Sequence, residues 1–198
     1  MTAVFDDLLT DAVVDHDVLS AIYGEPHRTV VHKVADRIND ETARYVAATS
    51  LVFVSSYSPD GRCDVTPRGG APGFVKILDD RTLAIPDVPG NRRLDTMHNV
   101  LYTGRIGALF VIPGRTDGVR FNGRACVSTR PDLLARFDTL KRPPAVALVL
   151  ETDEVFIHCA SALNRSNAWR PEKWLARDVA PTMNTLWESH LADNGIEA

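Results

Sequence analysis

The chain has 198 residues, of which 44% are hydrophobic, and its 22 basic and 26 acidic side chains give a formal net charge of −4. This length and apolar content suit a single buried core, and no basic face emerges that would favour nucleic acid as a partner. No apolar run approaches the roughly 20 residues that span a bilayer, and the N-terminus lacks a signal-peptide pattern. We therefore expect a soluble, cytoplasmic protein that binds neither nucleic acid nor membrane.

The first 49 residues have helical character. Apolar residues spaced between positions 13 and 22 predict an amphipathic helix, which Pro26 interrupts. A second helix is expected over residues 39–48 with Asn39 as its N-cap. Its inward face is expected to carry Ile38, Ala43, Val46 and Ala47. We treat residues 1–49 as an N-terminal helical extension and residues 50–198 as the main domain.

From residue 50 the sequence becomes β-rich, and proline and glycine turns follow one another at short spacing. The predicted strands are residues 50–57, 62–66, 73–78, 82–85, 106–112 and 119–129. A closing hairpin is expected from residues 145–151 and 154–158. The predicted helices begin after Asn91, at Pro131 and at Cys159. This order favours a mainly β, α+β fold with an antiparallel barrel over a doubly wound sheet.

The segment from Pro86 to Thr96 is the strongest candidate for a binding site. It follows an apolar strand, breaks at two prolines and a glycine, and then opens a predicted helix with Arg92 and Arg93 in its first turn. Basic residues are unfavourable there unless an anion offsets the helix dipole, and phosphate suits both the free N–H groups and the guanidinium groups. The alternative, a solvated helix start with incidental arginines, stays open.

Two further strands carry polar side chains on one face. Alternation places Asp64, Thr66 and Arg68 together, and the two glycines that follow would let a ligand approach the backbone. An ordinary edge strand that ends in turn residues is the alternative. Residues 120–125 alternate in the same way, and there we favour a solvent-facing row over a pocket lining.

The cysteines, Cys63, Cys126 and Cys159, are odd in number and form no CxxC pair. This spacing argues against a disulfide framework and against a zinc site. His158 beside Cys159 suggests a catalytic thiol or a metal ligand, but we favour buried structural thiols and expect no metal site. The sequence also lacks GxGxxG, GxxxxGK[ST], GxSxG and HExxH motifs, so a cofactor is the better candidate to carry the chemistry.

Four segments together resemble a known family. Residues 64–75, 83–95, 120–125 and 154–169 are similar to a branch of the pyridoxamine 5′-phosphate oxidase-related FMN-binding split-barrel flavoproteins. The resemblance covers about residues 40–175, and Pro-Gly-Asn-Arg-Arg followed by an aspartate is its most specific motif. It implies a split β-barrel in which FMN lies at the interface of a homodimer.

The resemblance also implies cofactor contacts in one chain. These are Thr66 and Arg68 at the flavin, Asn91, Arg92 and Arg93 on the ribityl phosphate, and Asn99 close behind. From the partner chain, Arg165, Ser166 and Trp169 would approach the same flavin. Two positions depart from the family pattern, because Ser161 stands where many relatives carry lysine and Gly70 where they often carry aspartate.

The implied function is that of an FMN-dependent oxidoreductase. It would act on a small-molecule substrate with a reduced nicotinamide or another electron donor, and no catalytic residue is singled out. The alternatives are an F420-dependent reductase, a non-catalytic flavin- or haem-binding module, and a pyridoxal-phosphate carrier. Pyridoxamine phosphate oxidation itself is not implied, because the substrate-phosphate residues of that enzyme have no match here.

Overall fold

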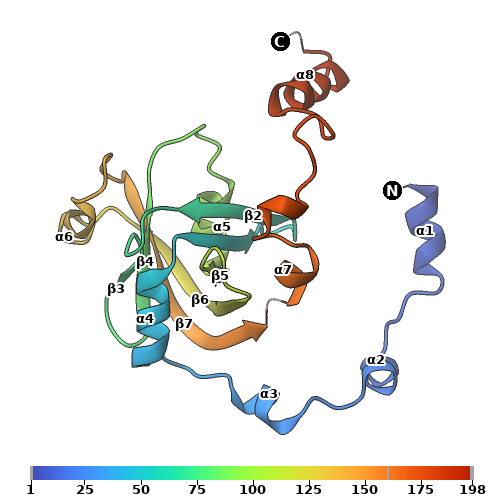
Figure 1. Ribbon diagram of the computed structural model, residues 1–198, viewed down its shortest axis with the longest axis horizontal. Helices are drawn as coiled ribbons and strands as arrows, with labels where there is room; N and C mark the ends of the chain where they lie inside the picture. Colours follow the sequence, from blue (N-terminus) through green and yellow to red (C-terminus); the bar gives the residue numbers. More distant parts are fainter. Residues whose placement is uncertain (1, 160, 197–198) are drawn as a thin grey trace.

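The computed structural model describes residues 2–159 and 161–196, and its centre is one seven-stranded antiparallel sheet in the order β2-β1-β5-β6-β7-β4-β3 (Figure 1). The strands are β1 (Leu51–Tyr57), β2 (Cys63–Gly69), β3 (Lys76–Ile77), β4 (Thr82–Asp87), β5 (Arg105–Val111), β6 (Asp117–Ser128) and β7 (Val146–Cys159). The predicted α+β fold with an antiparallel, barrel-like sheet is confirmed.

The helices lie around this sheet and along both ends of the chain. They are α1 (Ala3–Leu9), α2 (His16–Tyr23), α3 (Arg28–His32), α4 (Asp40–Ala48), α5 (Asp95–Thr103), α6 (Pro131–Leu134), α7 (Ser161–Arg165) and α8 (Met183–Asp193), with 3-10 turns at Ala135–Phe137 and Pro171–Lys173. No helix in the described part of the chain combines the length and the apolar character needed to cross a bilayer.

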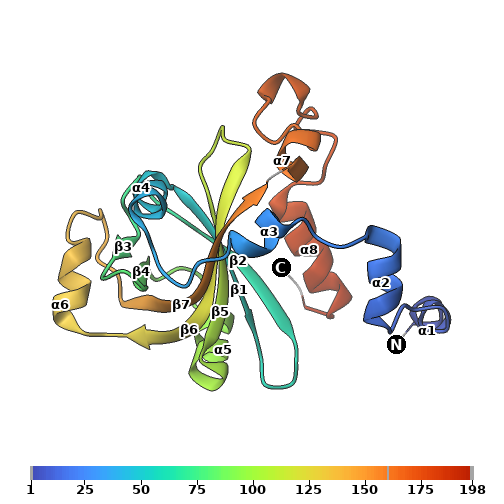
Figure 2. The same ribbon diagram turned by 90° about the horizontal axis from the view of Figure 1, so that it is seen from below.

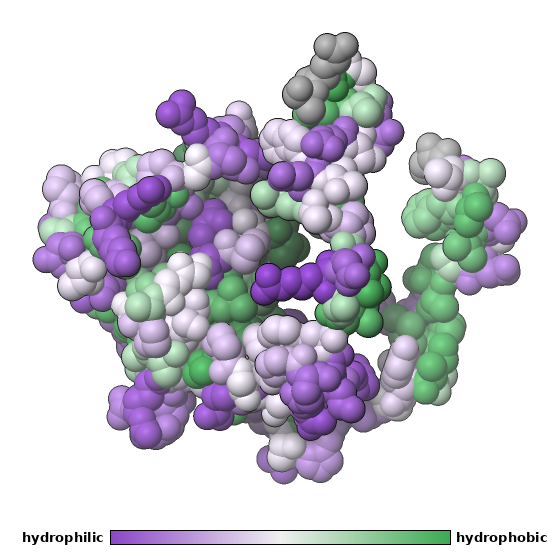
Figure 3. Space-filling model, turned by 45° about the horizontal axis from the view of Figure 1, so that its top comes forward, coloured by the Kyte–Doolittle hydropathy of each residue, from purple (hydrophilic) through white to green (hydrophobic). Residues whose placement is uncertain are grey.

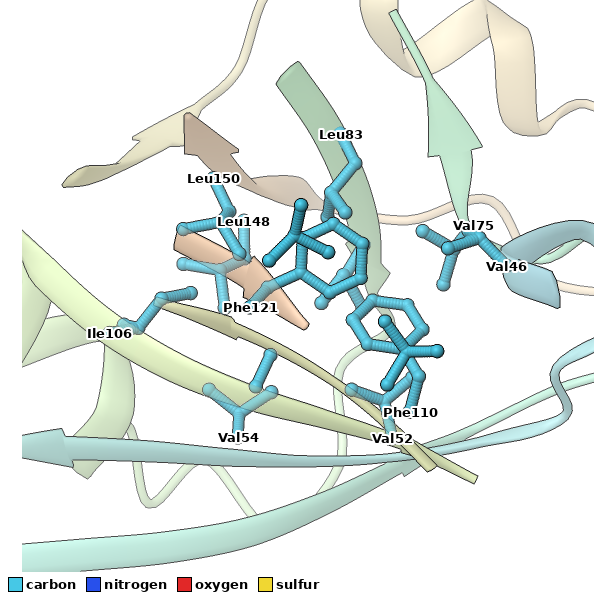
Figure 4. Close-up of a cluster of buried hydrophobic side chains, with 14 of the residues drawn as sticks. Val46, Val52, Val54, Val75, Leu83, Ile106, Phe110, Phe121, Leu148 and Leu150 are labelled. Carbon is cyan, nitrogen blue, oxygen red and sulfur yellow. The ribbon is translucent and has the colours of Figure 1, made fainter. Parts of the chain in front are cut away.

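The core lies inside the curled sheet. Along β1, Val52 and Val54 are fully buried while Phe53 between them is exposed, as the period of a strand requires. Phe110 of β5 and Phe121 of β6 pack with ring centroids 4.8 Å apart in a tilted arrangement that aromatic pairs favour. Figure 4 shows these rings together with apolar side chains from β4, β7 and α4. Packing from several strands on one cluster holds the sheet in its curved shape.

The sheet is split rather than closed. Strand β2 forms one edge and β3 the other, so in the described part of the chain no ladder of backbone hydrogen bonds completes a ring. An ion pair crosses this opening instead, with Arg68 Nε of β2 lying 3.1 Å from Asp87 Oδ1 of β4. The edge position of β2 also explains how Pro67 sits inside a strand, because an edge strand needs partners on one side only.

Strand β7 corrects one prediction. Residues 145–158 do not form a hairpin; Val146–Cys159 is a single strand that pairs with β6 from Ala147 to Cys159. The register shifts between Asn122 and Gly123, which leaves Asp153 as the extra residue of a bulge. A Cβ at Gly123 would lie 2.0 Å from the Glu151 carbonyl oxygen, so only glycine allows this approach. The polar residues that suggested a turn are therefore a bulge.

Helix α4 follows its prediction closely. The Asn39 side chain accepts a hydrogen bond from the Thr42 backbone N–H at 2.9 Å, which confirms the N-cap. Ile38 and Val46 are buried as expected. Ala47 is exposed, contrary to the prediction, because the inward stripe continues from Val46 to the buried Thr49 instead.

Two strand predictions were too long or too short. The strand expected over residues 73–78 is only Lys76–Ile77, since Phe74 and Val75 are buried in the core without strand pairing. Gly73 has a φ of +83°, which bends the chain before them. The strand expected over residues 62–66 continues to Gly69, and this extension carries Arg68 to the opening of the sheet.

The two ends of the chain differ from the sheet. Helices α1, α2, α3, α7 and α8 contain no buried residue, and Figure 2 shows α1 and α2 separated from the sheet. Asp15 caps α2 through a 2.9 Å bond to the Asp17 N–H, so Val13 and Val14 precede the helix instead of belonging to it as predicted. Apolar side chains gather on these separate segments in Figure 3.

Candidate functional site

A cleft of about 1100 Å³ lies beside the opening of the sheet. Its walls come from β2, from the segment between β4 and the first turns of α5, from the loop before β7, and from the start of β7. Arg68 and Asp87 form the ion pair across the opening, and both residues line the cleft. The cleft is therefore built where the split sheet leaves its interior accessible.

The β2 wall carries the predicted polar row. Asp64, Thr66 and Arg68 are half-buried on one face, while Cys63, Val65 and Pro67 are exposed on the other. Arg68 Nη1 donates to Thr66 Oγ1 at 2.9 Å, and its Nε is held by Asp87. These contacts fix the guanidinium group at the cleft wall.

Asp64 anchors a buried polar network behind this wall. Its Oδ2 accepts from Thr96 Oγ1 at 2.6 Å and from Ser56 Oγ at 3.3 Å. Asn99 Nδ2 donates to the same Ser56 oxygen at 3.0 Å. Because Thr96, Asn99 and Ser56 are all buried, the network joins the start of α5 to β1 and β2 and sets the position of the segment that precedes α5.

The segment before α5 differs from its prediction. Arg92 has a φ of +63°, which a right-handed helix excludes, and the helix begins only at Asp95. Arg92 and Arg93 therefore precede the helix, and an aspartate occupies its first turn, where a negative charge suits the dipole. The turn is shaped by the Asn91 side chain, whose Oδ1 accepts from the Arg93 backbone N–H at 3.0 Å.

The two arginines have different surroundings. Arg93 Nε lies 2.5 Å from Asp95 Oδ2, and this hydrogen-bonded carboxylate raises the pKa of Arg93. Arg92 makes no ion pair with any carboxylate in the described ranges 2–159 and 161–196. Both line the cleft and are exposed, so their side chains are available to an anion in it.

The structure brings most of the predicted residues of one chain together. Thr66, Arg68, Asn91, Arg92 and Arg93 all line the cleft. Asn99 lies in the network behind it, and its amide is occupied by Ser56.

The predicted residues near the C-terminus lie elsewhere. Arg165, Ser166 and Trp169 are not among the residues that line this cleft in the same chain. Arg165 donates to Ser161 Oγ at 3.3 Å, and the Trp169 indole donates to the Arg115 carbonyl at 2.8 Å. The helix expected over residues 159–168 is shorter, Ser161–Arg165, and Ala160 lies outside the described residues.

Sequence reasoning missed several residues of the cleft. Asp87 was not expected to hold Arg68, because the two residues lie on different strands and meet only when the sheet curls. Lys141 and Arg142 also line the cleft. In the sequence they form a basic pair before two prolines and a strand, and this pattern could have identified them as candidate site residues. At Gly70, a Cβ would lie 2.7 Å from Phe74 Cβ, so an aspartate there would require Phe74 to move.

The expectation for the thiols was wrong. Cys63, Cys126 and Cys159 are all exposed. Cys126 lies on the same face of β6 as Arg124 and Asn122, so its exposure follows from strand alternation. Within residues 2–159 and 161–196, no group of three or more His, Cys, Asp or Glu side chains is arranged to hold a metal ion.

Structural comparison finds the same fold in known proteins. HupZ of Group A Streptococcus matches with a TM-score of 0.51 and 19% identity over 62% of this chain and 95% of that chain. A single-residue variant of HupZ matches with a TM-score of 0.50 and 19% identity over 61% and 99%. A candidate pyridoxamine 5′-phosphate oxidase from Lactobacillus delbrueckii is 20% identical over 62% and 95%, with a TM-score of 0.47.

The sequence itself matches one family model. No curated protein matches the chain in sequence. The model for pyridoxamine 5′-phosphate oxidase matches residues 38–159, which include the whole sheet and both sides of the cleft. The chain belongs to the pyridoxamine 5′-phosphate oxidase family.

Proposed function

We propose that the protein is an FMN-dependent oxidoreductase that binds the flavin in the cleft of the split sheet. The observation that carries this proposal is the convergence of Thr66 and Arg68 with Asn91, Arg92 and Arg93 on one cavity. These residues come from two segments that the sheet order places on opposite sides of the opening. Family membership supports the same cofactor class.

The donor set fits a phosphate group. Arg92 and Arg93 provide guanidinium donors that match phosphate oxygens, and a charge-assisted bond of this kind is stronger than a neutral one. Arg92 lacks a carboxylate partner in the described part of the chain, so a dianion would supply its missing counter-charge. The turn that Asn91 closes holds the two arginines at the rim. We assign the ribityl phosphate to this end of the cleft.

The opposite wall fits the polar edge of a ring. Thr66 and Arg68 carry hydroxyl and guanidinium donors, and Asp87 limits the movement of the guanidinium group. Donors held in this way stabilise negative charge at a ring edge and so tune its reduction potential. Bound FMN would itself supply the hydride or single-electron chemistry, and the residues of this chain bind and orient it.

A homodimer would complete the site. Arg165, Ser166 and Trp169 lie away from the cleft of their own chain, and we assign them to the flavin of a second copy. The Trp169 indole is already fixed by Arg115, which gives that segment a defined position before any contact with the second copy. In this proposal residues 50–198 form the flavin-binding domain, and residues 1–49 are an extension of it.

The test is an absorption spectrum of the purified protein, followed by mass spectrometry of the compound that it releases. We expect flavin bands, release of FMN, bleaching of the bound flavin by NADH or NADPH, and a dimer in analytical ultracentrifugation. A colourless protein that fails to bind added FMN would contradict the proposal. Released F420 would indicate a deazaflavin reductase, and tightly bound flavin that no donor reduces would indicate a non-catalytic carrier. Released haem or pyridoxal phosphate would identify those cofactor classes.

A further inference from the structure

A second pair of cations faces the same cleft. Lys141 and Arg142 line it from the loop that precedes β7. The backbone places this loop next to the segment after β4, because Asp87 at the end of β4 pairs with Val146 at the start of β7. Figure 1 shows both loops at the same end of these two strands. The cleft therefore has two neighbouring cationic rims.

The fold holds this loop at both ends. Leu140 packs against the cluster of Leu133, Phe137, Ala84 and Ala147, and its N–H donates to the Phe137 carbonyl at 3.0 Å. On the other side Pro144 is buried, and the Ala145 N–H donates to the Asp87 carbonyl at 3.0 Å. The two cations thus lie on a short, anchored stretch that includes two prolines, which restrict the backbone further.

The charges of the cleft are unbalanced. Five cations line it, Arg68, Arg92, Arg93, Lys141 and Arg142, against three acids, Asp64, Asp87 and Asp95. The cleft is therefore positive by two charges in a chain whose formal net charge is −4. Asp87 and Asp95 already pair with Arg68 and Arg93, and Asp64 accepts from two hydroxyl groups. Among the described residues no carboxylate pairs with Lys141 or Arg142.

The cavity is large for a site that binds one small molecule. Its volume of about 1100 Å³ exceeds the roughly 300–1,000 Å³ typical of a site for one small molecule. We propose that Lys141 and Arg142 form a second anion site, which binds a phosphate or carboxylate group of the substrate or electron donor beside the flavin. This inference rests on the proposed flavin site, and it assigns an anionic second ligand to the enzyme.

The test is calorimetric titration of the FMN-saturated protein with two probes, sodium pyrophosphate for phosphate groups and sodium citrate for carboxylate groups. The variant is Lys141→Ala/Arg142→Ala. The matched control is Lys173→Ala/Arg177→Ala, which removes two exposed cations that do not line the cleft. Circular dichroism checks that both variants fold. The change in flavin absorbance on anion addition reports whether the anion binds next to the ring.

We expect wild type and control to bind at least one of the two probes with a change in the flavin spectrum. The Lys141→Ala/Arg142→Ala variant should bind that probe at least tenfold more weakly, with FMN affinity unchanged within twofold. Pyrophosphate binding alone indicates a phosphate-bearing ligand, and citrate binding alone a carboxylate-bearing one. Failure of the wild type to bind either probe, or equal binding by the variant, would overturn the proposal.

Two further outcomes separate this inference from the proposed function. If the variant loses FMN affinity as strongly as anion affinity, the pair belongs to the cofactor phosphate site and the second site is refuted. If wild type binds no FMN, the proposed function fails. The same titrations are then repeated on flavin-free protein. If only the Lys141→Ala/Arg142→Ala variant loses anion binding while wild type and control keep it, the anion site is supported. Any other result refutes it.

Discussion

The body of the molecule, residues 35–159, and its terminal segments, residues 2–34 and 161–196, contain the same kinds of residue in opposite surroundings. Val54 in β1 is fully buried, whereas Val14 before α2 is 94% exposed. In the body each strand has neighbours that cover its apolar face, so the apolar residues that alternate along the strand are buried. Helices of seven, eight and five residues, as α1, α2 and α3 are, gain little stability without packing. Apolar content alone therefore does not form a core.

The same contrast separates the candidate site residues. The cleft residues belong to the body, where Asp64 and Asp87 hold the elements that carry them. Arg165, Ser166 and Trp169 belong to a terminal segment and lie outside the cleft. In our proposal the body supplies one half of the flavin site, and a second copy supplies the other half.

The largest expected effect is at the centre of the body. Phe121→Ala removes a fully buried ring that packs on Phe110, so the free energy of unfolding should fall by about 3–5 kcal/mol. The matched change in a terminal segment, Phe5→Ala, removes a ring that is 55% exposed and should stay within about 0.5 kcal/mol. Urea denaturation of both variants measures the difference. Similar losses of unfolding free energy in the two variants would contradict the difference between the body and the terminal segments.

A smaller loss is expected from the polar network. Asp64→Ala leaves the Thr96 and Ser56 hydroxyls without their acceptor, which should cost about 1–3 kcal/mol. Asp11→Ala, in the exposed N-terminal segment, is the control and should leave stability unchanged. Urea denaturation again provides the measurement. An Asp64→Ala protein as stable as wild type would mean that the network does not anchor α5.

Deletion of residues 2–34 tests the contrast directly. The deletion removes the Lys33 ammonium group, 5.8 Å from the centre of the Phe156 ring, and such exposed contacts contribute about 0.5–1 kcal/mol. We expect the midpoint of thermal unfolding to move little and the free energy of unfolding to fall by about 1 kcal/mol or less. A loss of several kcal/mol would mean that this segment packs on a folded surface, in its own chain or in another.

The smallest effect concerns pH at the boundary between the two regions. Burial, and then Arg120 and Lys33, lower the pKa of His158 below its ordinary value of 6.5. The unfolded chain then binds the proton more readily, so the free energy of unfolding declines as pH falls through about 6.5 toward the lowered pKa. In His158→Gln this decline between pH 7.5 and pH 5 should be smaller. An unchanged pH profile would assign the decline to other groups.

Most strands could be located because the alternation that defines them is local, although β2 was predicted too short and β3 too long. The pairing of Arg68 with Asp87 could not be predicted, since it depends on how the whole sheet curls. The start of α5 was misplaced because Arg92 adopts a positive φ, and nothing about an arginine indicates this. The bulge in β7 was mistaken for a turn, because polar residues between two apolar runs suit both structures. Lys141 and Arg142 could be recognised in the sequence as a basic pair before two prolines, but their place at the cleft depends on the pairing of Val146 with Asp87 at the end of β4.

The most direct test of the central claim compares two flavins that differ by the phosphate. Equilibrium titrations of wild type and Arg92→Ala/Arg93→Ala with FMN and with riboflavin isolate the phosphate contact. Charge-assisted bonds contribute about 1.5–3 kcal/mol each, so the variant should bind FMN at least about 100-fold more weakly, while its riboflavin affinity stays within twofold of wild type. Unchanged FMN affinity in the folded variant, or an equal loss for riboflavin, would contradict the phosphate site.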